Sequence, residues 1–284
     1  MTASAAKHRP LWLCALGRRP LPGELAVAGA RYGLAQVYKN DFFAVTARYD
    51  RVSAEAEAGA PGSVVLKMNR QAPALIPLRF VGRVLAWREA GAFERVGILP
   101  GIPRFLGRFE DTGVIHEFVP GHAMRKGERV SDDFHDRLHE LIAGIHARNV
   151  AYVDLEKCEN VIVGDDGRPY LVDFQIAFYW PWRFGGRSFP VRWLLRRFQS
   201  ADRYHLVKLH RRTRRDQLSP EALAASYRRP WYVRLHGLLM RPLTLLRRRI
   251  LDRLDPRRGE GERGRVDADG STLRAGGADR TGAA

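Results

Sequence analysis

Cysteine is scarce in this sequence, with only Cys14 and Cys158 among 284 residues. Two cysteines exclude a disulfide-rich framework and a zinc site built from several thiolates, and they favour a reducing compartment. Long apolar runs are also missing. Leu11–Leu16 has six residues, too few for a signal-peptide core, and no run approaches the roughly 20 residues that cross a bilayer. We therefore expect a cytoplasmic protein.

Acidic residues are few relative to basic ones: 31 Asp and Glu stand against 48 Lys and Arg, a net charge of +17 at pH 7. Most of the excess lies between Arg187 and Arg258, where twenty basic residues face five acidic ones. Such a balance predicts an anionic partner: a phosphorylated substrate, a membrane surface or a nucleic acid. The hydrophobic content of 45% is ample for a buried core in one large or two small domains.

The most informative stretch runs from Ile145 to Phe178 and contains a predicted β-hairpin. Its parts are two short β-branched or aromatic runs and a glycine turn: Val161–Val163, Tyr170–Val172 and Gly164–Gly167. Asn160 directly precedes the first strand and Asp173 directly follows the second, so antiparallel pairing brings their oxygens to one edge, where they could hold a divalent cation. Asp154 lies six residues before Asn160, on a loop that could present it to a substrate hydroxyl.

This set of residues resembles the signature of the protein-kinase superfamily, and most closely that of small bacterial lipopolysaccharide-core and RIO-type serine/threonine kinases. The resemblance covers about residues 36–210. It implies an α+β, two-lobed kinase-like fold, with a small antiparallel-sheet first lobe and a helical second lobe. It also implies that Asp154 accepts the proton of the acceptor hydroxyl, while Asn160 and Asp173 hold Mg²⁺ against the phosphates of ATP. Glu159 is an alternative metal ligand.

The sequence departs from the family pattern at three places within this stretch. The usual His-Arg-Asp reads Tyr152-Val153-Asp154, and Gln175 replaces the glycine after Asp-Phe. The loop from Asp154 to Asn160 is one residue longer than usual. An inactive pseudokinase that binds a membrane or a nucleic acid is therefore the alternative to an ATP- and Mg²⁺-dependent kinase acting on a protein, sugar or glycolipid hydroxyl.

Residues 63–68 form a predicted strand that resembles the lysine-bearing strand of kinases. The resemblance implies that Lys67 contacts the α- and β-phosphates and pairs with a glutamate on the following helix. That helix is predicted over Phe80–Phe93 from its apolar spacing, with an apolar face made of Val81, Val84, Leu85 and Ala92. Glu89 fits the family position best, and Glu94 is the alternative.

Two further segments are assigned to the nucleotide. A strand, turn and strand from Gln36 resembles the hairpin that covers ATP phosphates in kinases. Because it has no Gly-x-Gly-x-x-Gly, phosphate contacts must come from Lys39 or from turn amides. The Glu117-Phe118-Val119 segment is similar to the hinge of small-molecule kinases, which implies that main-chain groups of Glu117 and Val119 bind adenine.

Four segments follow from this interpretation: an extension (1–30), a first lobe (31–119), a second lobe ending in basic amphipathic helices (120–255) and a disordered tail (256–284). A long buried helix is expected over Ser131–Asn149, leading into the loop of Asp154. The basic helices, which include Trp231–Met240 and Pro242–Leu254, could lie on an anionic membrane, at its inner face. The alternative is that they complete the second lobe and carry basic outer faces. Nucleic acid is the less favoured partner.

Overall fold

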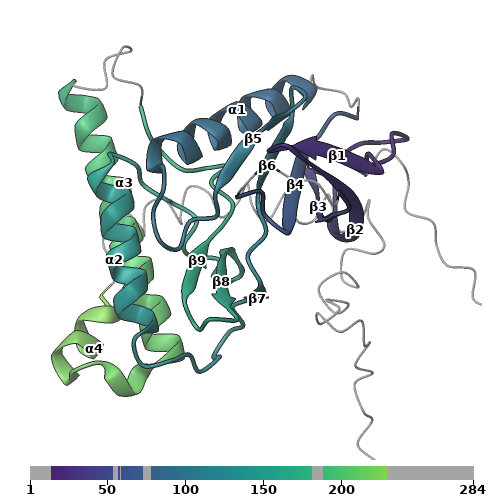
Figure 1. Ribbon diagram of the computed structural model, residues 1–284. Coiled ribbons are helices and arrows are strands. Elements are labelled where there is room, and N and C mark those ends of the chain that lie inside the picture. Colours follow the sequence, from purple (N-terminus) through teal and green to yellow (C-terminus); the bar gives the residue numbers. More distant parts are fainter. Residues whose placement is uncertain (1–13, 54–56, 58, 73–77, 181–187, 229–284) are drawn as a thin grey trace, which may run out of the picture.

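The computed structural model describes residues 14–53, 57, 59–72, 78–180 and 188–228, which combine antiparallel sheets with helices in an α+β architecture (Figure 1). Six strands form the first sheet in the order β1-β2-β3-β4-β6-β5, and every neighbouring pair is antiparallel. Their bounds are β1 Glu24–Val27, β2 Ala30–Asn40, β3 Ala44–Arg51, β4 Ser63–Asn69, β5 Phe105–Phe109 and β6 Gly113–Glu117.

The first sheet begins earlier in the chain than residue 31. Strand β1 lies within the segment expected to be an extension, and it pairs with β2 from Glu24 to Val27. Ahead of β1, Ala15 is fully buried and its carbonyl accepts hydrogen bonds from the backbone N–H groups of Gln71 and Ala72. Residues 14–30 are therefore part of the sheet region, because β1 pairs with β2 and the side chains of Ala15 and Leu25 are buried there.

Alternate residues of the central strand β4 face different surroundings. Val64, Leu66 and Met68 belong to a hydrophobic cluster on one face of the sheet, together with aromatic side chains of β2 and β3. Residues on the other face, including Lys67, point toward helix α1 (Leu78–Val96). This period of two explains how a strand of six buried residues can still present one lysine to a site.

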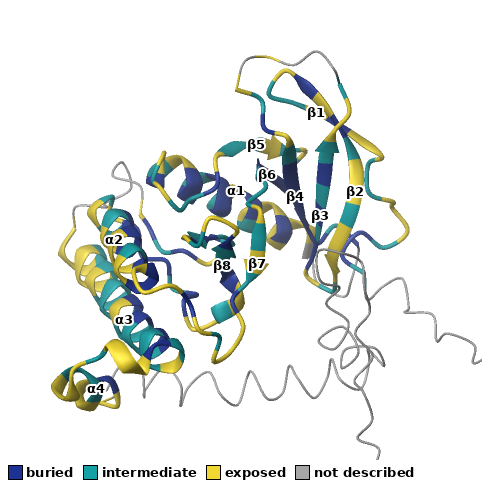
Figure 2. Cartoon of the chain, turned by 60° about the horizontal axis from the view of Figure 1, so that its bottom comes forward, coloured by how far each residue is buried: buried dark blue, intermediate teal, exposed yellow. Residues whose placement is uncertain are grey.

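Helix α1 lies across this second face of the sheet (Figures 1 and 2). The predicted apolar face is wrong at two of its four residues: Val81 and Val84 are 43% and 36% exposed, whereas Ala92 is fully buried and Leu85 is half-buried. The buried face also contains Glu89, which is 1% exposed, and its apolar members are small residues and one aromatic ring: Ala86, Ala90, Ala92, Phe93 and Val96. Small side chains let the helix approach the sheet closely, and the one buried charge has a cation opposite it.

The rest of the described chain contains a small sheet and the remaining helices. Strands β7 (Gly121–Ala123), β8 (Val161–Gly164) and β9 (Pro169–Leu171) pair antiparallel in that order, so β8 and β9 form the predicted hairpin. Helix α2 (Phe134–Ala147) packs beside α3 (Phe189–Thr213), as Figure 1 shows. The other elements are two 3-10 helices, η2 (Cys158–Asn160) and η4 (Arg215–Gln217), and the short helix α4 (Pro220–Ser226).

The predicted helices over Trp231–Met240 and Pro242–Leu254 and the predicted tail from residue 256 fall outside the described residues. Within the described part of the chain, no helix combines the length and the apolar character needed to cross a bilayer.

Candidate functional site

Lys67 is the centre of a buried charge cluster that joins three elements. Its Nζ donates to Glu89 Oε1 on α1 at 3.0 Å and to Asp173 Oδ1, just after β9, at 2.7 Å. Lys67 is 8% exposed and Glu89 only 1%. Glu94, the alternative partner, lies on the exposed side of α1. The structure thus pairs Lys67 with Glu89, from elements 22 residues apart in sequence.

Among the described residues, Lys67 is the one cation in contact with both Glu89 and Asp173, and this sharing determines the pKa values of the two carboxyl groups. Burial raises the pKa of Glu89 to about 7, although the attraction of Lys67 opposes the rise. Burial acts in the same direction on Asp173, but the nearer Lys67 ammonium outweighs it and leaves the pKa of Asp173 below its ordinary value. Burial alone would lower the pKa of Lys67, yet the two carboxyl groups raise it. Lys67 and Asp173 are therefore charged, and of the two carboxyl groups Glu89 keeps its proton to the higher pH.

The β8–β9 hairpin brings the other predicted polar groups to the same place. Val161 pairs with Leu171, and the N–H of Val172 donates to the Asn160 carbonyl at 3.1 Å. Asn160 and Asp173 consequently flank the open end of the hairpin, as the sequence predicts.

The longer loop still places Asp154 beside Asn160. Two consecutive turns absorb the extra residue, with Lys157 N–H donating to the Asp154 carbonyl at 3.3 Å and Asn160 N–H donating to the Lys157 carbonyl at 3.1 Å. The side-chain amide of Asn160 then donates to Asp154 Oδ2 at 2.9 Å. Lys157 Nζ reaches the same oxygen at 2.7 Å. Burial raises the pKa of Asp154, and the hydrogen bond from Lys157 partly offsets the rise.

Asp202 on α3 anchors this loop and has no counterpart in the sequence-based prediction. Its side chain is fully buried, and its Oδ2 accepts from His146 Nε2 at 2.9 Å and from the N–H of Tyr152 at 2.8 Å. Its Oδ1 accepts from the N–H of Val153 at 2.8 Å. Val153 has φ +71°, a conformation that β-branched residues rarely adopt. One signal was available, since Asp202 is the sole acidic residue between Phe189 and Arg215.

Gln175, the second residue after Asp173, connects the Asp173 segment to the first sheet. Its Nε2 donates to Oδ1 of Asn69, a fully buried residue at the end of β4, at 2.9 Å. Phe174 between them is buried and its ring lies 4.9 Å from that of Phe93 on α1. Further along, Arg88 on α1 donates to the Ala177 carbonyl at 3.0 Å. The segment is held from both β4 and α1. Asn69 is a residue that sequence analysis missed.

Three predicted nucleotide-binding residues lie apart from the charge cluster. Lys39 is on β2, pairs with Asp41 at 3.0 Å, and is 58% exposed in its side chain. The turn amides of Phe43 and Ala44 donate to Asp41 Oδ1 at 2.8 and 2.9 Å, so Asp41 already occupies them. Glu117 ends β6, and its side chain lies 3.8 Å from Arg104.

Val119 follows β6, and its backbone N–H makes no hydrogen bond with the described residues. This donor remains available at the segment that resembles a hinge.

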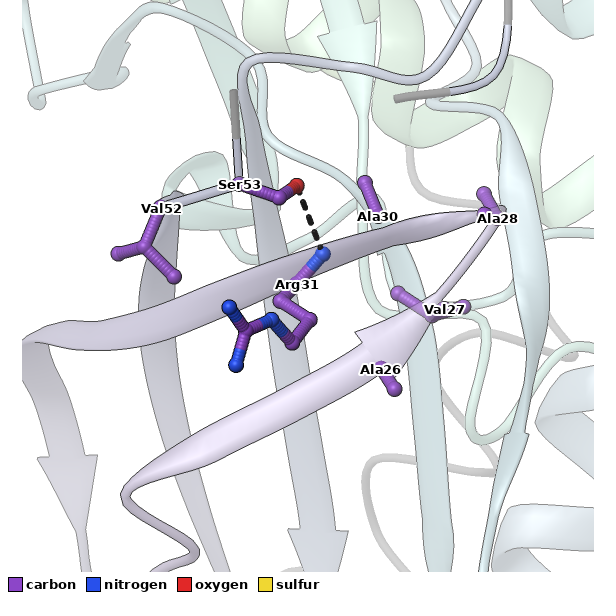
Figure 3. A pocket seen from close by; sticks show the side chains of 8 residues that line it. Ala26, Val27, Ala28, Ala30, Arg31, Val52 and Ser53 are labelled. Carbon is purple, nitrogen blue, oxygen red and sulfur yellow. Dashed lines mark hydrogen bonds between the residues drawn. The ribbon is translucent and has the colours of Figure 1, made fainter. Parts of the chain in front are cut away.

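A hollow elsewhere on the protein does not involve these groups (Figure 3). It lies at the β1–β2 turn, where the N–H of Arg31 donates to Ser53 Oγ at 3.1 Å. Its lining consists of Ala26, Val27, Ala28, Gly29, Ala30, Arg31, Val52 and Ser53. None of the residues predicted to bind nucleotide or metal lines it, so the candidate site is the Lys67 cluster.

The arrangement places Lys67, Asp173, Asp154 and the Asn160 amide where a polyanion and a hard cation could meet. Among the described residues, no group of three or more His, Cys, Asp or Glu side chains is placed to hold a metal ion. Mg²⁺ commonly takes only one or two protein carboxylates and completes its shell with water and phosphate oxygens. No protein-family model matches this chain, and no curated protein matches it with significance.

Proposed function

We propose that this protein is an ATP- and Mg²⁺-dependent phosphotransferase with a two-lobed kinase-like fold, acting on a hydroxyl of a protein, sugar or glycolipid. The observation that carries the proposal is the Lys67 bridge between Glu89 and Asp173, at 3.0 and 2.7 Å. A strand lysine, a helix glutamate and the acid after a hairpin are the parts that position nucleotide phosphates in kinases.

The residues present fit a magnesium ion. Asp173 receives Lys67 through Oδ1, and Asn160 uses its amide nitrogen for Asp154. Neither Asp173 Oδ2 nor Asn160 Oδ1 accepts a hydrogen bond from the part of the chain that the structure describes. These two oxygens are of the type that Mg²⁺ prefers. The bound ion would neutralise charge that develops on the transferring phosphoryl group.

The protein's own groups account for the remaining roles. Lys67 would bind phosphate oxygens of the donor, and Glu89 holds the Lys67 ammonium on the face of the first sheet that α1 covers. Asp154 has its Oδ2 fixed by Lys157 and Asn160, which leaves Oδ1 to accept the proton of the acceptor hydroxyl. Its raised pKa makes this carboxylate a better base than an exposed aspartate. The free N–H of Val119 supports adenine binding at the segment between β6 and β7.

The direct test is transfer from radiolabelled ATP by the purified protein, offered separately to protein, lipid and saccharide fractions. We expect one fraction to be labelled in a Mg²⁺-dependent reaction. Asp154→Ala should lower turnover by roughly 10²–10⁴-fold with nucleotide affinity nearly unchanged, because it removes only the base. Asp173→Ala should weaken MgATP binding as well as turnover.

Nucleotide binding without transfer to any fraction would instead make this a binding protein. Equal loss of nucleotide affinity in both variants would mean that the roles of Asp154 and Asp173 are misassigned.

A further inference from the structure

The first half of α3 presents aromatic and basic side chains on its surface. Phe189, Trp193 and Leu194 are 79%, 51% and 37% exposed. The buried residues of this helix all come later in it: Asp202, Leu206 and Leu209. With 25 residues, α3 is much longer than its 14-residue neighbour α2, and its first turns extend past the packed region (Figure 1).

The exposed residues form an ordered stripe. At about 100° per residue, Phe189 and Trp193 lie within roughly 40° of each other on the helix, and Arg192 and Arg196 lie along one side of them. We name these four residues the α3 stripe; Leu194 lies about 100° from Trp193 and outside the stripe. No acidic residue occurs from Phe189 to Ala201, so nothing within this stretch of the helix neutralises the arginines. The stripe is therefore both apolar and positively charged.

We propose that the α3 stripe docks the protein on an anionic lipid surface. Helices that lie in a membrane interface bury an aromatic and aliphatic ridge while flanking arginines reach phosphate head groups. Each arginine near such a surface adds to the attraction, within the range of charge screening. The ridge is convex and lies on one helix, whereas sequence-tolerant nucleic-acid binding uses a groove that follows the backbone. The observations favour lipid over nucleic acid.

Helix α1 supplies a comparison surface on which two of the arginines share an acidic partner. Phe80 and Trp87 on α1 are 63% and 48% exposed, comparable with the aromatic pair of the stripe. The neighbouring arginines of α1, Arg79 and Arg83, both pair with Asp111. Exposed aromatic area is therefore present on both helices, but Arg79 and Arg83 have an acidic partner, whereas no ion pair with a described residue is found for Arg192 or Arg196.

The test measures co-sedimentation of the full chain with phosphatidylcholine vesicles, with and without phosphatidylglycerol, at low and high salt. Wild-type protein should bind the anionic vesicles, and salt should weaken the binding. The double variant Phe189→Ser with Trp193→Ser should bind at least tenfold less, as expected for losing two buried aromatic anchors. Arg192→Gln with Arg196→Gln should also lose roughly tenfold or more.

The control is the α1 double variant Phe80→Ser with Trp87→Ser, which should bind like wild type. Thermal unfolding checks that all three variants fold. If the α3 aromatic variant does not fold, the binding of the α3 arginine variant alone tests the proposal. Three results overturn the proposal: no binding to anionic vesicles, equal loss in the α1 variant, or unchanged binding in the α3 variants. Binding to an oligonucleotide that needs the α3 stripe, with vesicles ignored, overturns it in favour of nucleic acid.

Discussion

Replacing Asp202 by asparagine should slow phosphoryl transfer by about 5- to 30-fold and lower the unfolding free energy by about 1–2 kcal/mol. The carboxylate accepts three hydrogen bonds, and asparagine can keep the two at one oxygen only by turning its NH₂ group toward the N–H of Val153. A buried donor that faces another donor costs about 1–3 kcal/mol, and the charge assistance of the remaining bonds is also lost. The anchor of the Tyr152–Val153 backbone therefore weakens by about 3 kcal/mol.

The loop can relax to another conformation, so the loss in unfolding free energy is smaller than the weakening of the anchor. Val153 at φ +71° stores about 1–3 kcal/mol of backbone strain, which it recovers by leaving the left-handed region. The loss in unfolding free energy is then capped at about 1–2 kcal/mol, because relief of strain offsets part of it. Within the folded state, the productive loop, which carries Asp154, then lies about 1–2 kcal/mol above the relaxed loop and becomes about 5- to 30-fold less populated.

The assay is single-turnover phosphoryl transfer beside urea unfolding, with Gln199→Ala as the control. Gln199 lies on the same helix and donates to the carbonyls of His146 and Val150, so its loss should cost similar stability at nearly normal rate. In the Asp202→Asn background, Val153→Gly should restore part of the rate, because glycine adopts positive φ without strain. A normal rate in Asp202→Asn, or an equal fall in Gln199→Ala, would refute the reasoning.

Three other perturbations test separate contacts. Glu89 has a folded-state pKa of about 7 against an ordinary 4.5, so its protonated form contributes stability that is lost as pH rises from 4.5 through about 7; urea titrations should show this loss in wild type but not in Glu89→Gln. Gln175→Ala leaves the buried Asn69 Oδ1 without its donor, and we expect about 1 kcal/mol less stability and an about fivefold higher KM for MgATP. Burial lowers the pKa of His135 from its ordinary 6.5 to about 3, so wild type should lose stability as pH falls from 6.5 through about 3. The variant His135→Phe has no such group and should lose less stability over this range in acid unfolding.

The parts of the site that sequence predicts are those set by short-range geometry. The hairpin follows from two β-forming runs around a turn, and its closure makes Asn160 and Asp173 neighbours whatever the rest of the chain does. The alternation of side chains along a strand places Lys67 on the opposite face from its apolar neighbours, and Glu89 lies at the expected position on the next helix. Such contacts need only the local pattern and one adjacent element, which a single sequence contains.

The parts that sequence misses depend on which element covers which. Val81 and Val84 fit an apolar helical spacing, yet α1 turns Glu89 inward because Lys67, which also binds Asp173, compensates its charge. The sequence of α1 alone does not predict this contact, since the cluster includes Asp173, which is 106 residues from Lys67. Asp202 poses the same problem: it lies about 50 residues beyond the loop that it holds. Hydrophobic pattern alone assigns a buried acid to the surface.

The four buried or partly buried acids of this region differ in how their charge is met, and that difference separates their roles. Asp202 uses both oxygens on fixed donors, so it can hold the loop but has little capacity for a ligand. Glu89 has one cation at Oε1, while its buried Oε2 has no hydrogen-bond partner among the described residues, which is consistent with its raised pKa. Asp173 and Asp154 each bind a lysine through one oxygen, and in Asp173 that oxygen also accepts from a main-chain N–H. The other oxygen of each carboxylate receives no hydrogen bond from the described chain. Only a carboxylate that is both charged and partly unused can serve a cation or a hydroxyl proton, and this criterion selects Asp154 and Asp173 independently of any resemblance.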